Sequence, residues 1–405
     1  MSDFFRLQKH IDELSKIGGH DTAVTRLGLS SEEQAARELV ASWCEARGAQ
    51  IRRDAAANLY ARFPGERDGE PVVLVGSHLD SVPEGGRFDG ALGVLCAIEA
   101  IESLLDVGTR FDRPVELVGW ADEEGARFGI GLFGSSAAFG RLPASAAQRA
   151  DRGGTTIADA LRALGENGDP QLARRDPKTI ANYLEVHIEQ GPRLADSNRA
   201  LGVVSDIVGI VHGRVTLTGR ADHAGATVMT ARADAFLGGA EIALALETAA
   251  REQDDAVGTV GEVSVRPGAK NVVPGECVFS IDVRAPDQAR IDAVIKTLDE
   301  AMTRICAARD LRFSLDVFNS VPPTPLDPSL RDLFLRAATS VGVDAPELVS
   351  GAGHDAQNPQ LAGVPTGMLF VRSTGGSHTP RESVAIADAA LGADALSFAI
   401  RRLAG

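Results

Sequence analysis

Histidines and carboxylates occur where apolar segments of the chain end. The segments 71–80, 115–121 and 182–189 are each short and apolar, and they contain or directly precede His78, Glu123, Glu124 and His187. A fourth segment near 364–371 is followed by SHTPRE, which contains His378. Open α/β sheets place their sites at the carboxyl ends of strands, so these side chains are candidates for one shared site.

A site of this composition could hold divalent metal ions. Imidazoles and carboxylates bind such ions, and a pair of ions also needs a carboxylate that can bridge them. The candidate ligands are His78, Asp89, Glu124, His187 and His378.

Two further carboxylates lie beside the candidate ligands. Asp80 could accept the second ring N–H of His78 and so fix its tautomer. Glu123 is not needed as a ligand, and it could accept a proton from water bound at the metal site.

The spacing His-x-acid is weak evidence by itself. With eight histidines and 56 acidic residues in the chain, about one such match is expected by chance. His10 and Asp12, in a predicted N-terminal helix, form the match that we attribute to chance. Each histidine alone could be a core or surface residue, and the acidic run 122–124 could be a solvated turn. These alternatives would have to hold independently at several strand ends.

The first 200 residues predict alternating strands and helices. Ser30 and Glu33 are typical of a capping box before a helix that ends near Arg47, where Gly48 has the position of a C′ glycine. A buried strand at 71–80, a helix at 91–105 and a second buried strand follow. This order predicts an α/β domain with a mostly parallel sheet.

From about residue 208 the pattern changes. The expected elements are strand, helix, strand, strand, helix, strand at 210–218, 231–252, 257–265, 276–284, 287–308 and 311–318. This βαββαβ order is the ferredoxin-like motif. A proline-rich segment, 321–328, then returns the chain to the first domain, which a helix, the strand near 364–371 and a last helix from about 384 complete. The predicted domains are 1–207 with 325–405, and an inserted domain at 208–324.

Composition excludes several classes of protein. The chain has 405 residues with 41 basic and 56 acidic side chains, a net charge of −15 that disfavours nucleic acid and anionic membranes as partners. No apolar run is long enough for a signal peptide or a membrane span. The four cysteines form no paired motif and are expected to be reduced. We therefore expect a cytoplasmic protein.

Several motifs resemble those of the amidase/hydantoinase/carbamoylase group of dinuclear metallohydrolases, within the carboxypeptidase/aminoacylase superfamily. They are GSHLDSVPEGGRFDGALGV, ADEEGARFG, EVHIEQGPRL, GRADHAGA, GAGHDA and GGSHTPRE. The resemblance covers nearly the whole chain in order. Asp89 lies 11 residues after His78, and His187 stands where many exopeptidases of the superfamily use an acid, which favours this group over the exopeptidases.

The resemblance implies how the ligands are shared. Asp89 would bridge two ions, with His78 and His187 on one ion and Glu124 and His378 on the other. The ligand set suits zinc, manganese, nickel or cobalt.

The resemblance also implies roles for other residues. Glu123 corresponds to the general base, and Gln190 to a residue that contacts the substrate amide. His223 corresponds to a lid histidine that stabilises the oxyanion and comes from the other subunit of a homodimer. Asn271 and Arg284 correspond to the pair that holds the substrate carboxylate.

Without the resemblance, these assignments have simpler alternatives. Arg284 shares the polar face of its predicted strand with Asp282 and could be a solvated strand-end arginine. Asn271 could be an ordinary turn residue, and His223 a loop histidine. The family commonly has threonine and proline after HAG, whereas this chain has Ala226 and Val228 in HAGATVM. The local shape near His223 therefore does not follow from the family.

The predicted function is hydrolysis of N-carbamoyl-L-amino acids to amino acid, carbon dioxide and ammonia, with two divalent ions per subunit. The alternatives are allantoate amidohydrolase or β-ureidopropionase chemistry, an aminoacylase or dipeptidase, and a non-catalytic metal- or ligand-binding relative. A binding protein has no need of Glu123. We expect a homodimer that acts on a small ureido or carbamoyl acid, with each site completed in trans.

Overall fold

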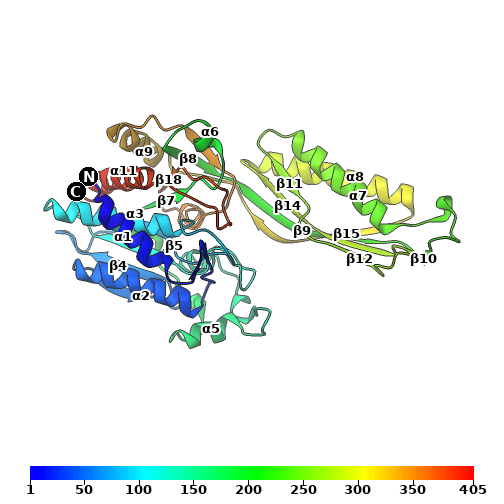
Figure 1. Cartoon of the computed structure of the whole chain (residues 1–405), viewed down its shortest axis with the longest axis horizontal. Helices are drawn as coiled ribbons and strands as arrows, with labels where there is room; N and C mark the ends of the chain where they lie inside the picture. Colours follow the sequence, from blue (N-terminus) through cyan, green and yellow to red (C-terminus); the bar gives the residue numbers. More distant parts are fainter. The chain divides into compact units, whose positions relative to one another are not determined.

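The computed structural model describes residues 1–405, which form two compact units (Figure 1). The first unit comprises Met1–Ser205 and Pro325–Gly405, and the second is the insertion Asp206–Thr324. These borders lie within two residues of the domain borders that the sequence predicts.

The first unit is built on a nine-stranded sheet in the order β16-β8-β18-β7-β5-β6-β4-β3, with β17 beside β8. Its central strands pair in parallel and are β18 (Thr366–Val371), β7 (Ile180–Ile188), β5 (Val72–His78) and β6 (Val115–Trp120). Every residue of β5, β6 and β18 is buried, as expected for strands covered on both faces.

The sheet is parallel at its centre, as predicted, and its edges are antiparallel, which the sequence did not indicate. At one edge β4 (Leu59–Phe63) runs antiparallel to β6, and β3 (Gln50–Arg53) runs antiparallel to β4. Only a short turn joins β3 to β4, and such a connection requires antiparallel strands. At the other edge β8 (Leu201–Ile207) is antiparallel to β18, and the short strands β16 (Thr324–Pro325) and β17 (Glu347–Ser350) join it.

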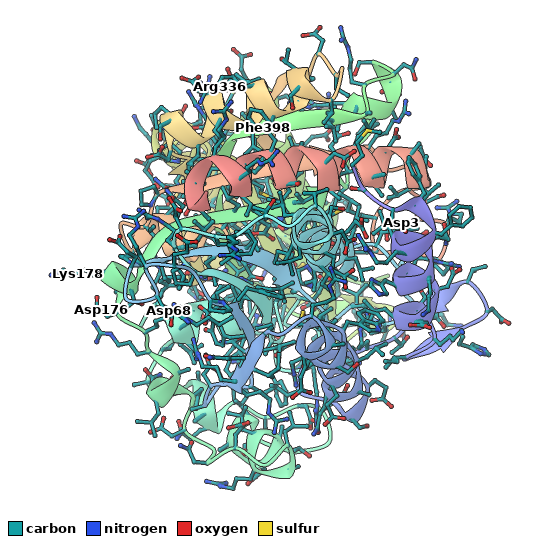
Figure 2. All side chains as sticks on the ribbon, turned by 90° about the vertical axis from the view of Figure 1, so that its left-hand side faces the viewer. Asp3, Asp68, Asp176, Lys178, Arg336 and Phe398 are labelled. Carbon is teal, nitrogen blue, oxygen red and sulfur yellow. The ribbon has the colours of Figure 1, made fainter.

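One face of this sheet is covered by long helices that share an apolar core with it. They are α1 (Phe4–Ser15), α2 (Ser31–Ala46), α3 (Ala91–Asp106), α9 (Pro328–Ser340) and α11 (Ile386–Ala404). Phe398 on α11, Arg336 on α9 and Asp3 before α1 mark this layer in Figure 2.

On the other face of the sheet, Trp120 contacts Tyr60, Tyr183 and Phe139. The short helices of this unit are α4 (Phe133–Ala138), α5 (Ile157–Ala163), α6 (Arg193–Asp196) and α10 (Gln357–Leu361), and a small hairpin pairs β1 (Gly19–His20) with β2 (Ala23–Val24).

The predicted capping box before α2 is half formed. Ser30 Oγ accepts the Glu33 N–H at 3.2 Å, and Gly48 follows the helix with φ +88°. Glu33 does not bond back to Ser30. Its carboxylate accepts the N–H groups of Leu29 and Asp122, so it instead fastens the start of α2 to the segment after β6.

The second unit has the predicted order of elements. Its antiparallel sheet runs β11-β14-β9-β15, with β12 also pairing with β14. The elements are β9 (Gly209–Thr218), α7 (Ala235–Arg251), β11 (Val257–Thr259), β12 (Val263–Arg266), β14 (Glu276–Ala285), α8 (Gln288–Arg309) and β15 (Arg312–Val321). Alternate residues of β14 are buried, and α7 and α8 pack on that face. None of the helices in the chain is long and apolar enough to cross a bilayer.

Two boundaries in this unit differ from the prediction. The expected strand 257–265 is divided into β11 and β12, because one extra residue lies between them: Thr259 pairs with Asp282, and Val263 pairs with Phe279. The first helix begins at Ala235 and not at 231, because the Asp234 side chain caps it by accepting the N–H groups of Phe236 and Leu237.

Gly93 determines how closely α3 approaches the strands that carry His78 and His187. A Cβ atom at position 93 would lie 2.0 Å from the carbonyl oxygen of Val186 in β7 and 2.7 Å from Ser77 Cβ in β5. The obstructing atom of Val186 belongs to the backbone of a central strand and cannot move away by a change of rotamer.

We predict that Gly93→Ala destabilises the protein by about 1–3 kcal/mol, because α3 must move away from the sheet. Helix propensity alone favours alanine here by about 1 kcal/mol, so a loss of stability identifies the packing constraint. Denaturant unfolding measures the change. Gly69→Ala is the matched control, because a Cβ at position 69 meets no atom within 4 Å. Equal stability of Gly93→Ala and the wild type would contradict this account.

Candidate metal centre

The carboxylate of Asp89 lies between two groups of possible ligands. Its Oδ1 is 3.3 Å from His187 Nε2 and 3.9 Å from His78 Nε2, and its Oδ2 is 3.3 Å from His378 Nε2. His378 Nε2 is in turn 3.2 Å from Glu124 Oε2. In each group, His78–Asp89–His187 and Asp89–Glu124–His378, the ligand atoms lie within 4.8 Å of one another. The structure thus brings all of the predicted ligands together.

The parallel centre of the sheet explains this convergence. His78 is the last residue of β5, His187 lies one residue before the end of β7, and Glu124 and His378 are in the segments that follow β6 and β18. Parallel neighbours end at the same edge of a sheet, so residues far apart in the sequence meet there. Asp89 comes from the loop that leads into α3.

An oxygen atom lies beside Nδ1 of each of the two buried histidine rings. His187 Nδ1 lies 2.9 Å from the Ile188 carbonyl oxygen, so this nitrogen is the donor and Nε2 keeps its lone pair toward Asp89. His78 Nδ1 is 3.3 Å from Asp80 Oδ1, and its Nε2 faces Asp89 and Glu123. Asp80 therefore lies beside this ring nitrogen, and the hydrogen bond that the sequence analysis assigns to the pair stays a prediction.

Asp80 also makes two hydrogen bonds that the sequence did not predict. Its two carboxylate oxygens accept the backbone N–H groups of Glu123 at 2.9 Å and Glu124 at 3.0 Å. One buried side chain therefore contacts His78 and also fixes the backbone of the neighbouring acids.

Gln190 contacts the centre directly. Its Nε2 donates to Asp89 Oδ2 at 2.9 Å, and Ser377 Oγ donates to the same oxygen at 2.7 Å. The contact of Gln190 with a substrate amide remains a prediction. Ser377 was not singled out in the sequence, although it directly precedes His378.

Burial and mutual charge shift the pKa values of these groups strongly. Burial raises the pKa of Glu123 well above its usual value, although His78 opposes the shift, and burial likewise raises the pKa of Glu124. Burial also acts against ionisation of Asp89, but His378, His187 and His78 outweigh it and lower the pKa of this carboxyl. Hydrogen bonds to Asp89 and Glu124 raise the pKa of His378 to about 10.

The residues fit divalent metal ions. Several carboxylates in a buried space favour a compensating cation. Glu124 Oε1 is buried and accepts no hydrogen bond from the protein. Imidazole nitrogens together with carboxylate oxygens are the donors that zinc, manganese, nickel and cobalt accept.

A third group of possible ligands, Glu185–His187–His354, shares His187 with this centre. Glu185 is already occupied, because Oε1 accepts from Ser77 at 2.8 Å and Oε2 accepts from the Ala356 N–H at 2.9 Å. The ring of His354 packs edge-on against His187, with centroids 4.5 Å apart. We therefore interpret Glu185 and His354 as residues that hold His187 in place and not as metal ligands. The motif GAGHDA contains His354 and Asp355, but the sequence assigned them no role.

His223 and Asn271 lie together in the second unit. β10 (Asp222–His223) pairs with β13 (Val272–Val273), and the Ala224 N–H donates to the Asn271 carbonyl at 2.9 Å. His223 Nδ1 accepts the N–H groups of Gly225 and Ala226, so its Nε2 carries the proton and can donate it. The backbone of Ala226 makes this bond, so the departure from the family pattern at Ala226 does not remove it.

Arg284 lies at the opposite end of the second unit's sheet. In β14 it pairs with Ile210 of β9, whereas Glu276, at the end near β13, pairs with Thr218. At about 3.3 Å per residue, the eight steps from Glu276 to Arg284 span about 26 Å. Asn271 and Arg284 of one chain therefore cannot hold the same carboxylate. Arg284 makes an ion pair with Asp282 at 2.9 Å.

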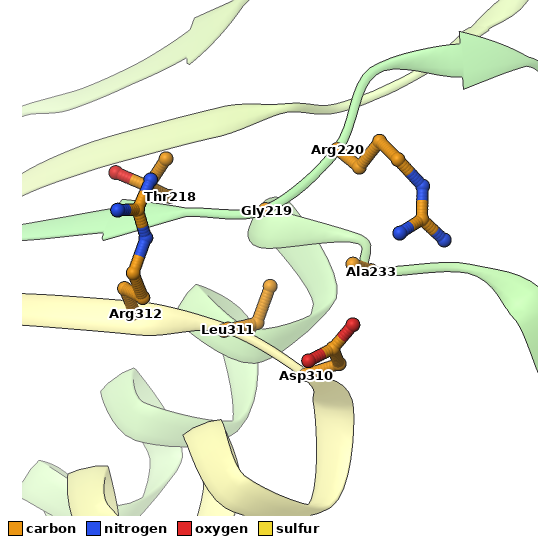
Figure 3. A pocket seen from close by; sticks show the side chains of 7 residues that line it. All are labelled: Thr218, Gly219, Arg220, Ala233, Asp310, Leu311 and Arg312. Atoms are coloured by element: carbon orange, nitrogen blue, oxygen red, sulfur yellow. The ribbon is translucent and has the colours of Figure 1, made fainter.

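A hollow of about 350 Å³ on the second unit is a poor alternative site (Figure 3). It is lined by Thr218, Gly219, Arg220, Ala233, Asp310, Leu311 and Arg312. The two guanidinium groups lie on different sides of Gly219 and do not converge, and the lining contains no histidine (Figure 3).

Comparisons with known proteins agree with this geometry. The profile of peptidase family M20/M25/M40 matches residues 74–402. The chain is 39% identical to an N-carbamoyl-L-amino acid amidohydrolase of Geobacillus stearothermophilus over 98% of both chains. It is 34% identical to an allantoate deiminase of Arabidopsis thaliana over 92% of this chain and 77% of that one. The structure superposes on a hydantoinase/carbamoylase family amidase of Burkholderia multivorans with a TM-score of 0.90 and 34% identity, covering 100% of this chain and 98% of the other. The chain therefore belongs to peptidase family M20/M25/M40 and, within it, to the hydantoinase/carbamoylase amidases, which makes it a hydrolase of C–N bonds.

Proposed function

We propose that the chain hydrolyses the linear C–N bond of N-carbamoyl-L-amino acids with two divalent ions per subunit. The observation that carries the proposal is the position of Asp89, whose two carboxylate oxygens each face a separate pair of ligands. His78 and His187 would hold one ion, Glu124 and His378 the other, and Asp89 would bridge them.

Bound ions would polarise the scissile carbonyl and make an attacking water more acidic. Glu123 has the position and the chemistry of a general base. Its Oε2 lies 3.7 Å from His78 Nε2, and burial raises its pKa well above the usual value, which makes the carboxylate a stronger proton acceptor. Glu123 would take the proton of the water and deliver it to the leaving nitrogen.

The relatives narrow the substrate class. The Geobacillus relative is named for N-carbamoyl-L-amino acids and the Arabidopsis relative for allantoate. Both names describe acids with a linear ureido group, and Arg284 supplies a cation for such a carboxylate. Allantoate is therefore the second candidate substrate.

The four cysteines are buried and unpaired, which supports a reducing, cytoplasmic compartment.

We predict metal-dependent release of ammonia from N-carbamoyl-L-amino acids. The assay follows both ammonia and free amino acid, and it compares these substrates with allantoate, an N-acetyl amino acid and a dipeptide, before chelation, after chelation and after addition of Mn²⁺ or Co²⁺. Turnover of the dipeptide or the N-acetyl compound alone would contradict the proposal. Full activity in protein shown to be free of metal would exclude the metal mechanism.

The assignment of Glu123 predicts that metal binding and turnover separate. Glu123→Gln should retain the wild-type metal content while kcat falls by about 10² or more, because the general base is lost. Asp89→Ala should lose metal, because both groups share this carboxylate. Metal analysis and steady-state kinetics on the same preparations measure both quantities. Near-normal kcat in Glu123→Gln would show that another group is the base.

We further propose that two subunits complete each site. The support is the distance between Arg284 and the His223–Asn271 pair within one chain. A carboxylate near Arg284 of one subunit can meet His223 and Asn271 only if these come from a second subunit. A homodimer with two-fold symmetry would complete both sites equally.

Mixing two inactive variants tests this sharing. Glu123→Gln and His223→Ala are combined after dissociation and reassociation of the subunits. If His223 acts in trans, each mixed dimer has one site with both defects and one intact site. Half of randomly formed dimers are mixed, so activity should recover to about a quarter of the wild-type level. No recovery, despite proven subunit exchange, would place His223 in its own chain's site.

A further inference from the structure

Glu382 contacts the backbone of Asp89, the residue whose carboxylate is shared by the two ligand groups. It has no role in the mechanism described above. It is 5% exposed, and its Oε1 accepts the backbone N–H of Phe88 at 2.9 Å and of Asp89 at 3.1 Å. These two N–H groups precede α3, whose N-cap is Gly90, and the N-terminus of a helix attracts a negative charge. The carboxylate therefore fixes the backbone from which the Asp89 side chain extends.

The loop that carries Asp89 packs closely against Glu382. A Cβ atom at Gly86 would lie 2.1 Å from Glu382 Oε1 and 2.6 Å from its Cβ. Only a residue without a side chain allows the loop and the carboxylate to approach in this way.

Glu382 also belongs to the segment that carries His378. Its N–H donates to the Thr379 carbonyl at 3.1 Å. The next residue, Ser383, exchanges two backbone hydrogen bonds of 2.9 Å with Thr374, which closes the segment into a loop around His378. Glu382 is thus held firmly at the base of one ligand loop while its side chain holds another.

We propose that Glu382 is a positioning residue that fixes the Asp89 loop relative to the His378 loop. This inference rests on the proposed metal centre. With the backbone of Asp89 held, its two carboxylate oxygens keep their separate directions toward the two groups. Residues that orient metal ligands commonly change metal affinity by 10- to 100-fold when they are lost.

The alternative is that Glu382 only holds the backbone that precedes α3 and contributes to stability without affecting metal binding. Asp327 provides a matched control, because its carboxylate accepts the N–H groups of Ser329 and Leu330 at the start of α9, which carries no ligand. Asp327→Ala should lower the melting temperature of the metal-free protein and leave its metal affinity unchanged.

The test is titration of the metal-free protein with Co²⁺ alone, followed by visible absorption and by competition with a chelator. Glu382→Ala should bind Co²⁺ about 10- to 100-fold more weakly than the wild type. Glu382→Gln keeps an oxygen that can accept both N–H groups, so its affinity should stay close to that of the wild type. Melting of each metal-free variant separates lost stability from lost affinity.

Gly86→Ala displaces the carboxylate without removing it, and it decides the question if Glu382→Ala does not fold. It should weaken Co²⁺ binding in the wild-type background and add less than its full effect in the Glu382→Ala background, since both changes disrupt one contact and only the clash with the Cβ of residue 382 remains. Wild-type affinity in both Glu382→Ala and Gly86→Ala would overturn the positioning role. If the wild type itself bound no Co²⁺, the proposed metal centre would fail instead.

Discussion

The burial of several negative charges around Asp89 is the constraint on which the rest of the site depends. Asp80 and Asp89 are buried and Glu123 is mostly buried, and each carboxylate near another makes ionisation of both more costly. Hydrogen bonds from backbone N–H groups and from Gln190 and Ser377 reduce this cost only in part. Divalent cations would offset the remaining charge. In the structure the histidines around Asp89 offset part of this negative charge, since they stabilise the ionised form of the Asp89 carboxyl group.

Buried and closely packed elements of the fold carry these charged residues. Parallel β5, β6 and β7 end side by side, and α3 packs against β5 and β7 through Gly93. The ligand loops are then fixed by side chains that do not bind metal, namely Asp80 behind Glu123 and Glu124, and Glu382 behind Asp89. The antiparallel edge strands β3 and β4 extend the sheet without supplying any of the ligands.

The sequence predicted the parts of the molecule that depend on local patterns. Buried strands such as β5 are visible as apolar runs, and the ligands were found because polar residues follow them. The antiparallel edges were missed, because a short exposed strand such as β3 has no apolar run. The second role of Asp80, the contact of Glu382 with the Asp89 backbone and the packing of His354 on His187 were missed as well. These contacts join residues up to about 290 positions apart, and nothing in the local sequence predicts such pairs. The separation of Asn271 from Arg284 likewise required the register of β14 on β9.

Anomalous diffraction from crystals loaded with Co²⁺ would test the central claim most directly. If Asp89 bridges two ions, two peaks should lie about 3.5–4 Å apart, one beside His78 and His187 and one beside Glu124 and His378. Both peaks should be lost together in Asp89→Ala. A single peak, or a peak in the Glu185–His187–His354 group in place of these two, would contradict the account.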